Sequence, residues 1–165
     1  MSEKKVIIGF AIATLLVLGG GIFFLSNSAS SGKVEVSQNA KASVDQTTSD
    51  YGNIPMYKGN VTKTFTIKNT GTDVLKLTNI KTSCHCTKAQ VKVEAGGSPF
   101  FGMDTVSSWV GEVAPGKEAY LDIIFDPAYH GPQGVGPINR FVTVETNDPG
   151  NKTLNFTVTG TVVKD

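Results

Sequence analysis

Hydrophobic and polar residues are distributed in two different ways along this chain. Residues 6–25 form an apolar segment without a charged residue, whereas apolar side chains after residue 54 recur at every second position in several short stretches. Alternation of this kind is typical of β-strands that bury one face. It occurs in residues 62–69, 73–80, 119–126, 140–147 and 154–163.

Turn-forming sequences separate these stretches, and no segment after residue 25 shows a helical period. Pro and Gly stand together in APGK (114–117) and in NDPGN (147–151). The pattern predicts an all-β domain, an antiparallel β-sandwich of about seven strands. The side chains expected to face its core are Phe65, Leu121, Ile123, Phe125, Val142, Val144, Phe156 and Val158.

The apolar segment 6–25 predicts one N-terminal transmembrane helix before the sandwich. As a helix it would span roughly 30 Å, about the thickness of the hydrocarbon core of a bilayer. Lys4 and Lys5 precede it, so we expect a single-pass cell-membrane protein with residues 1–5 in the cytoplasm and the domain outside. A cleaved signal peptide is the alternative, because SNSASSG (26–32) offers small residues to a peptidase.

Residues 26–53 are rich in small and polar side chains and contain few large apolar ones. Such a composition buries too little surface to offset the entropy cost of ordering the chain. We therefore expect a flexible polar tether, in which one short strand at 33–37 is possible, and a folded domain at 54–165.

The charge of the exported part argues against two classes of partner. Residues 26–165 carry 13 Lys or Arg and 13 Asp or Glu, which gives a formal charge of zero. No basic stripe is present, so neither nucleic acid nor an anionic lipid surface is expected to bind this part.

Several motifs, in this order, resemble an exported bacterial family of unknown function. The motifs are FTIKNTGTDVLKLTNI (65–80), SCHCT (83–87), APG (114–116), FDP (125–127) and TNDP (146–149). The resemblance spans roughly residues 60–163 and implies an immunoglobulin-like domain of the Hydin/major-sperm-protein type. Two features depart from the family: His85 replaces a glycine, and the segment 94–113 is longer than expected. The family brings no established enzymatic activity.

The sequence does not favour an enzyme. Its two histidines, His85 and His130, lie in no nucleophile motif, and no phosphate-binding loop or zinc-protease motif occurs. The aspartates that could form an acid–base pair are scattered and are expected to be solvated. These are Asp104, Asp122, Asp126 and Asp148.

Cys84, His85 and Cys86 are the densest cluster of reactive groups. One interpretation is structural, in which both cysteines fill space where a strand bends or form a disulfide without function. A second is a Cys84–Cys86 disulfide that acts as a redox switch, because an exported chain meets an oxidising space. A third is a copper or zinc site made by the three residues, with His130 or Met103 as a fourth ligand. No cofactor is expected under the first two.

The segment 94–113 contains a cluster of aromatic residues and glycines. Phe100, Phe101, Met103 and Trp109 could form a binding surface, because recognition residues collect on loops that a rigid scaffold holds. They could also fold back and cap the core. The sequence as a whole favours a membrane-anchored, extracytoplasmic, non-enzymatic module that binds a protein or another envelope component. The alternative is an exported metal-binding or thiol-redox protein.

Overall fold

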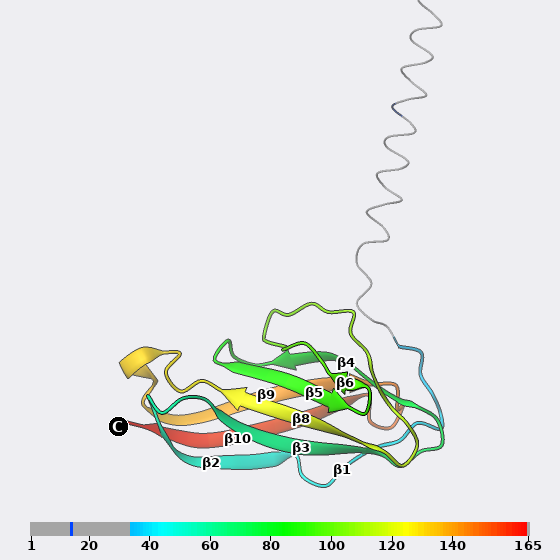
Figure 1. Cartoon of the computed structure of the whole chain (residues 1–165), viewed down its shortest axis with the longest axis horizontal. Helices are drawn as coiled ribbons and strands as arrows, with labels where there is room; N and C mark the ends of the chain where they lie inside the picture. The colour runs from blue at the N-terminus through cyan, green and yellow to red at the C-terminus, as the bar shows by residue number, and fades with distance from the viewer. Residues whose placement is uncertain (1–13, 15–33, 165) are drawn as a thin grey trace, which may run out of the picture. The chain divides into compact units, whose positions relative to one another are not determined.

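Two five-stranded sheets make up the folded part of the chain (Figure 1). The structure is a computed structural model that describes residue 14 and residues 34–164. The first sheet has the order β1 (Ala42–Val44), β3 (Val61–Asn69), β8 (Glu118–Phe125), β5 (Thr87–Val93) and β6 (Gly96–Gly97). The second has the order β2 (Thr48–Pro55), β10 (Thr153–Val163), β9 (Gly136–Thr146), β4 (Leu75–Thr82) and β7 (Gly111–Val113).

The all-β prediction is confirmed, with two differences in detail. The described residues form ten strands rather than about seven, because three of them are only two or three residues long. The sandwich is also not purely antiparallel, because β2 pairs with β10 in parallel, from Thr48 opposite Thr157 to Pro55 opposite Val163. The one helical element described after residue 33 is the short 3-10 helix η1 (Gly131–Gly134).

The core lies between the two sheets, as the alternation of apolar and polar residues predicted. All eight side chains predicted to face inward are buried. Phe65 of β3 and Phe156 of β10 meet across the layers, with their ring centroids 5.1 Å apart. Burial of alternate side chains on both sheets supplies the hydrophobic free energy that holds the layers together.

The prediction of a flexible tether up to residue 53 is wrong for residues 40–53. Ala40 and Ala42 are buried, β1 pairs with β3, and β2 pairs with β10. The chain before β1 also lies against the turn after β3, where Thr70 N–H donates to the carbonyl of Lys41 and Thr72 N–H to that of Asn39, both at 2.9 Å. These residues fold because backbone pairing and small buried alanines replace the large apolar side chains that their sequence lacks. The possible strand at 33–37 does not form over its described residues, 34–37.

The predicted cytoplasmic residues 1–5 and anchor 6–25 lie outside the described residues, apart from Thr14. Among the residues that are described, no helix combines the length and the apolar character needed to cross a membrane.

The connection between β4 and β5 carries the chain from one sheet to the other. β4 ends at Thr82 in the second sheet and β5 begins at Thr87 in the first. A small second hydrophobic cluster underlies this end of the sandwich and contains Ile54, Met56, Cys86, Phe125, Ile138 and Val162. The two cysteines therefore lie where the chain passes from one sheet to the other, packed against this hydrophobic cluster.

Candidate functional site

Hydrogen bonds fix the β4–β5 connection to its surroundings. Ser83 forms two of them with Phe141 of β9: its N–H donates to the Phe141 carbonyl, and its Oγ accepts from the Phe141 N–H, both at 2.9 Å. Within the turn, Thr87 N–H donates to the Cys84 carbonyl at 3.1 Å, and the Thr82 hydroxyl lies 3.1 Å from that same carbonyl oxygen. The turn thus holds its two cysteines in one defined arrangement.

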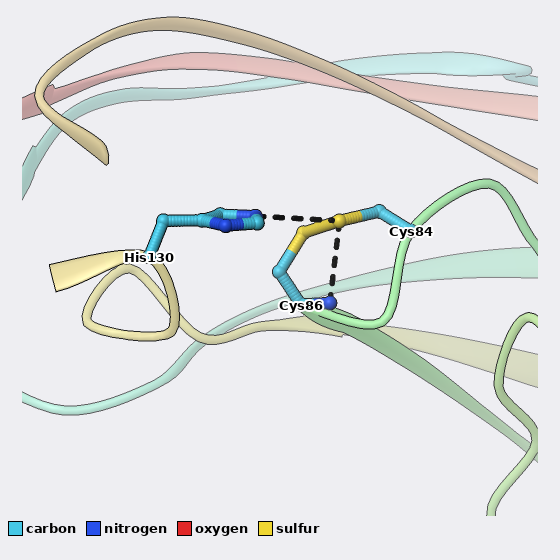
Figure 2. A group of neighbouring side chains, drawn as sticks. All are labelled: Cys84, Cys86 and His130. Carbon is cyan, nitrogen blue, oxygen red and sulfur yellow. Dashed lines mark hydrogen bonds between the residues drawn. A yellow bond between two sulfur atoms is a disulfide. The ribbon is translucent and has the colours of Figure 1, made fainter. Parts of the chain in front are cut away.

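Cys84 and Cys86 are joined by a disulfide (Figure 2). Their Cα atoms are 5.2 Å apart, within the usual range for disulfides, because the chain turns between them. Cys86 is buried and only 2% exposed, whereas Cys84 is half-buried. The two sulfur atoms therefore differ in their access to solvent.

His130 approaches this disulfide from a different part of the chain. Its Nε2 lies 3.7 Å from Cys84 Sγ (Figure 2). The turn after β8 brings it there, because Asp126 N–H donates to the Cys86 carbonyl at 2.9 Å and the Asp126 carboxylate caps Ala128 N–H at 3.0 Å. His130 is exposed, and its ring packs edge-on against Tyr129.

Of the proposed metal ligands, the structure brings together Cys84, Cys86 and His130 and separates His85 from them. Ligand atoms of Cys84, Cys86 and His130 all lie within 4.8 Å of one another. His85 is exposed and its Nε2 pairs with Asp104 at 3.4 Å instead. Two thiolates and an imidazole suit Cu(I) or Zn(II), but both sulfur atoms are engaged in the disulfide. Such an ion could be held only by the reduced protein.

Arg140 is the residue of this site that sequence reasoning missed. Its Nε donates to Cys86 Sγ at 3.1 Å, and its guanidinium lies over the Phe125 ring, 5.8 Å from the centroid. Partial burial lowers the pKa of the guanidinium below its ordinary value, although an arginine stays charged at neutral pH. The signal was present in the alternation of β9, where Arg140 takes the inward position between Ile138 and Val142.

The four predicted binding residues lie in the loop between β6 and β7 and form two pairs. Phe101 is 2% exposed and Trp109 packs against the core, with the two ring centroids 5.7 Å apart. Phe100 and Met103 are 54% and 38% exposed. The capping interpretation is therefore confirmed for Phe101 and Trp109, whereas Phe100 and Met103 stay candidates for a binding surface.

Two shallow grooves lie beside the disulfide and share His85 and Lys88 as lining residues. One, of about 360 Å³, is also lined by Phe100 and Met103. The other, of about 180 Å³, has Cys86 in its wall. The exposed apolar side chains of the loop and the disulfide thus belong to one continuous part of the surface.

The expectation that the four aspartates are solvated is wrong for two of them. Asp122 is 9% exposed, accepts from the Thr64 hydroxyl at 2.6 Å and pairs with Lys92 at 2.7 Å. Asp148 is 5% exposed and accepts three hydrogen bonds, two of them from backbone N–H groups. Each is satisfied within the fold, which is the condition for burying a carboxylate.

Residues 42–97 match a family model described as "Protein of unknown function (DUF1573)". This match confirms the predicted resemblance to a family of unknown function. No curated protein matches the chain.

Several solved structures are similar to this chain. A protein of unknown function from Porphyromonas gingivalis W83 superposes with a TM-score of 0.58 at 19% identity, over 78% of this chain and 50% of that one. The chain therefore spans half the length of that protein. A PapD-like domain of human CEP192 (TM-score 0.48, 17% identity, 84% and 96% coverage) and the E. coli chaperone DraB (0.40, 13%, 74% and 56%) are also similar. At 19% identity, the property that this chain shares with the Porphyromonas gingivalis protein is the fold.

Proposed function

We propose that the chain is a membrane-anchored, extracytoplasmic immunoglobulin-like module that binds a protein partner in the cell envelope. The recognition surface consists of Phe100 and Met103 together with the two grooves beside them. One observation carries this proposal: the loop presents large apolar side chains to solvent while its neighbours Phe101 and Trp109 are held in the core.

A loop of this construction is suited to recognition. Three apolar side chains within seven residues, Phe100, Met103 and Val106, are 54%, 38% and 85% exposed. Exposed apolar groups that gather in one place mark interaction sites more often than isolated ones do. Two hydrogen bonds also hold the loop in place. Gly102 N–H donates to Thr105 Oγ1 at 2.8 Å, and Lys81 Nζ donates to the Thr105 carbonyl. A partner that binds this surface would therefore lose little free energy in ordering it.

The double variant Phe100→Ser with Met103→Ser is expected to lose its partner. Aromatic and Met side chains at an interface centre supply much of the binding free energy, so we expect at least a tenfold drop in recovery of the partner. The measurement is photo-crosslinking from the loop in the native host, followed by quantification of the crosslinked protein.

A matched double variant, Val36→Ser with Tyr120→Ser, removes two side chains that are 56% and 44% exposed elsewhere. It should recover the same protein as the unmodified chain. If the loop variant and this control recover equal amounts, the loop is not the recognition surface.

The predicted transmembrane anchor determines the cell fraction in which the mature chain should be found. Because residues 6–25 are long, apolar and preceded by two lysines, the chain should remain in the membrane fraction after a high-salt wash. Residues 26–165 exported behind a cleavable leader should instead appear in the soluble extract, which provides the control. Recovery of the natural chain as a soluble species that begins near Ser30 or Ser31 would contradict the anchor and show cleavage.

A further inference from the structure

Arg140 combines a residue type that is rare in this chain with a position in β9 that usually holds an apolar side chain. The chain has 15 basic residues, of which 14 are Lys and this is the one Arg. It occupies an inward-facing position on β9, while the next residue, Phe141, is 50% exposed. Sequences usually place the aromatic side chain inside and the charged one outside, and departures from that rule concentrate at functional sites.

The charge of Arg140 has no carboxylate partner among the described residues. None of the ion pairs in residues 34–164 includes it. Its described contacts are the Cys86 sulfur, the carbonyl of Asn139 and the ring of Phe125. A partly buried cation without a counter-ion is unfavourable, and it favours any process that creates a negative charge beside it. Reduction of the disulfide does so, because it turns Cys86 into a thiol that can ionise.

The disulfide itself contributes little to holding the fold together. It links residues that are only two positions apart, so it removes little conformational freedom from the unfolded chain. The turn that contains it is already fixed by the backbone hydrogen bonds of Ser83 and Thr87. A disulfide that stabilises a fold strongly closes a longer loop.

We propose that the Cys84–Cys86 bridge is a thiol–disulfide exchange site whose substrate is a protein dithiol. Cys84 is the sulfur that the substrate attacks, and Cys86 is the leaving thiolate that Arg140 stabilises. This activity goes beyond the proposed binding function and does not depend on it.

The difference between the two sulfur environments sets this order. Cys84 is half-buried, whereas Cys86 is 2% exposed and receives the Arg140 N–H at 3.1 Å. The Thr87 hydroxyl, 3.7 Å from the same sulfur, can donate as well. Exchange is faster when the leaving thiolate is the more stable one, and a stabilised reduced form makes a disulfide a stronger oxidant.

The exchange balances in two steps. A thiolate of the substrate attacks Cys84 Sγ, the bond to Cys86 breaks, and its electron pair stays on Cys86 as a thiolate. The second thiol of the substrate then loses its proton and attacks the substrate sulfur in the mixed disulfide, which releases Cys84 as a thiolate. After protonation, two electrons and two protons have moved, the substrate is a disulfide, and Cys84 and Cys86 are thiols.

Removal of the arginine charge tests the leaving-group role. The full-length chain in detergent is equilibrated with mixtures of reduced and oxidised dithiothreitol, and its thiols are counted by alkylation and mass spectrometry. Arg140→Met should lower the equilibrium constant for reduction by about tenfold, or about 30 mV for a two-electron couple, and should slow reduction similarly.

Lys152→Met is the matched control, because it removes a positive charge from an exposed residue that lines neither groove. It should leave both quantities within about twofold. An equal effect of the two variants, or an unmodified chain that stays oxidised across the whole range of mixtures, would overturn the proposal.

Single cysteine variants test the order of attack and do not need Arg140 to be changed. The reverse of the proposed exchange begins with attack by the Cys84 thiolate. Incubated with oxidised glutathione as the probe, which releases reduced glutathione as the leaving thiol, Cys86→Ser should form a mixed disulfide through Cys84 at least tenfold faster than Cys84→Ser does through Cys86. Equal rates, or faster reaction at Cys86, would overturn the assignment of Cys84 as the attacked sulfur. Since neither experiment requires the envelope partner, failure of the exchange activity and failure of the binding function remain distinguishable.

Discussion

Phe156→Ala is expected to lower the free energy of unfolding by about 3–5 kcal/mol, a large share of the stability of a small domain. Phe156 is fully buried in β10 and meets the ring of Phe65 from the opposite sheet at 5.1 Å between centroids. Truncation removes apolar surface from the core and leaves a cavity between two sheets that their own ladders hold in place. Thermal unfolding should show a midpoint lower by roughly 10–20 °C.

Phe141→Ala is the matched control, because Phe141 lies on the neighbouring strand and its side chain is 50% exposed. This substitution removes the same atoms from the outer face and should change the free energy by less than about 1 kcal/mol. A midpoint for Phe156→Ala within a degree or two of the unmodified domain would show that the facing of β10 is wrong.

The strands that the sequence predicted correctly are those in which the alternation of apolar and polar side chains indicates the buried face. In 121–125 and 154–158 every second residue is a large apolar one, so a period of two identifies both the strand and its buried face. The structure buries Leu121, Ile123 and Phe156 accordingly. Patterning of this kind is local, and no tertiary information is needed to read it.

The first two strands could not be recognised in this way. β2 has the sequence TSDYGNIP, and only Ile54 within it is buried. Its place in the sheet depends on parallel pairing with β10, about a hundred residues away along the chain, and on the Tyr51 hydroxyl, which donates to the Ile123 carbonyl at 2.7 Å. Such long-range contacts leave no periodic trace in a sequence.

The candidate site was likewise predictable only where it depends on residues that are close together in the sequence. The short spacing of Cys84 and Cys86 drew attention to the correct turn, but adjacency in sequence suggested His85 as their partner. Neighbours in a tight turn point in different directions, and the histidine beside the disulfide is His130, which the turn after β8 delivers. Arg140 lies 54 residues after Cys86 in sequence and reaches its sulfur from β9.

Asp148, in the turn between β9 and β10, shows how a residue expected to be solvated can organise the fold. Its carboxylate accepts from Ala42 N–H at 2.9 Å, from Gly150 N–H at 2.8 Å and from the Asn151 side chain at 2.9 Å. The first of these bonds joins the β9–β10 turn to β1. Burial on its own would raise the pKa of Asp148, but the hydrogen bonds from Asn151, Ala42 and Gly150 together lower that pKa below its ordinary value.

Asp148→Ala is therefore expected to cost about 2–4 kcal/mol at pH 7, because it leaves buried N–H donors without an acceptor. A carboxyl whose pKa is lower in the folded state stabilises the fold above its unfolded pKa of about 3.9, and this contribution is lost as pH falls through the folded pKa. The difference between the variant and the unmodified domain should accordingly shrink below about pH 4 in chemical unfolding measured from pH 7 to pH 2. Asp45→Ala, which removes an exposed carboxyl from the turn after β1, should change stability by less than about 0.5 kcal/mol. An Asp148→Ala curve that runs parallel to that of the unmodified domain over the whole range would show that the carboxylate charge does not stabilise this turn.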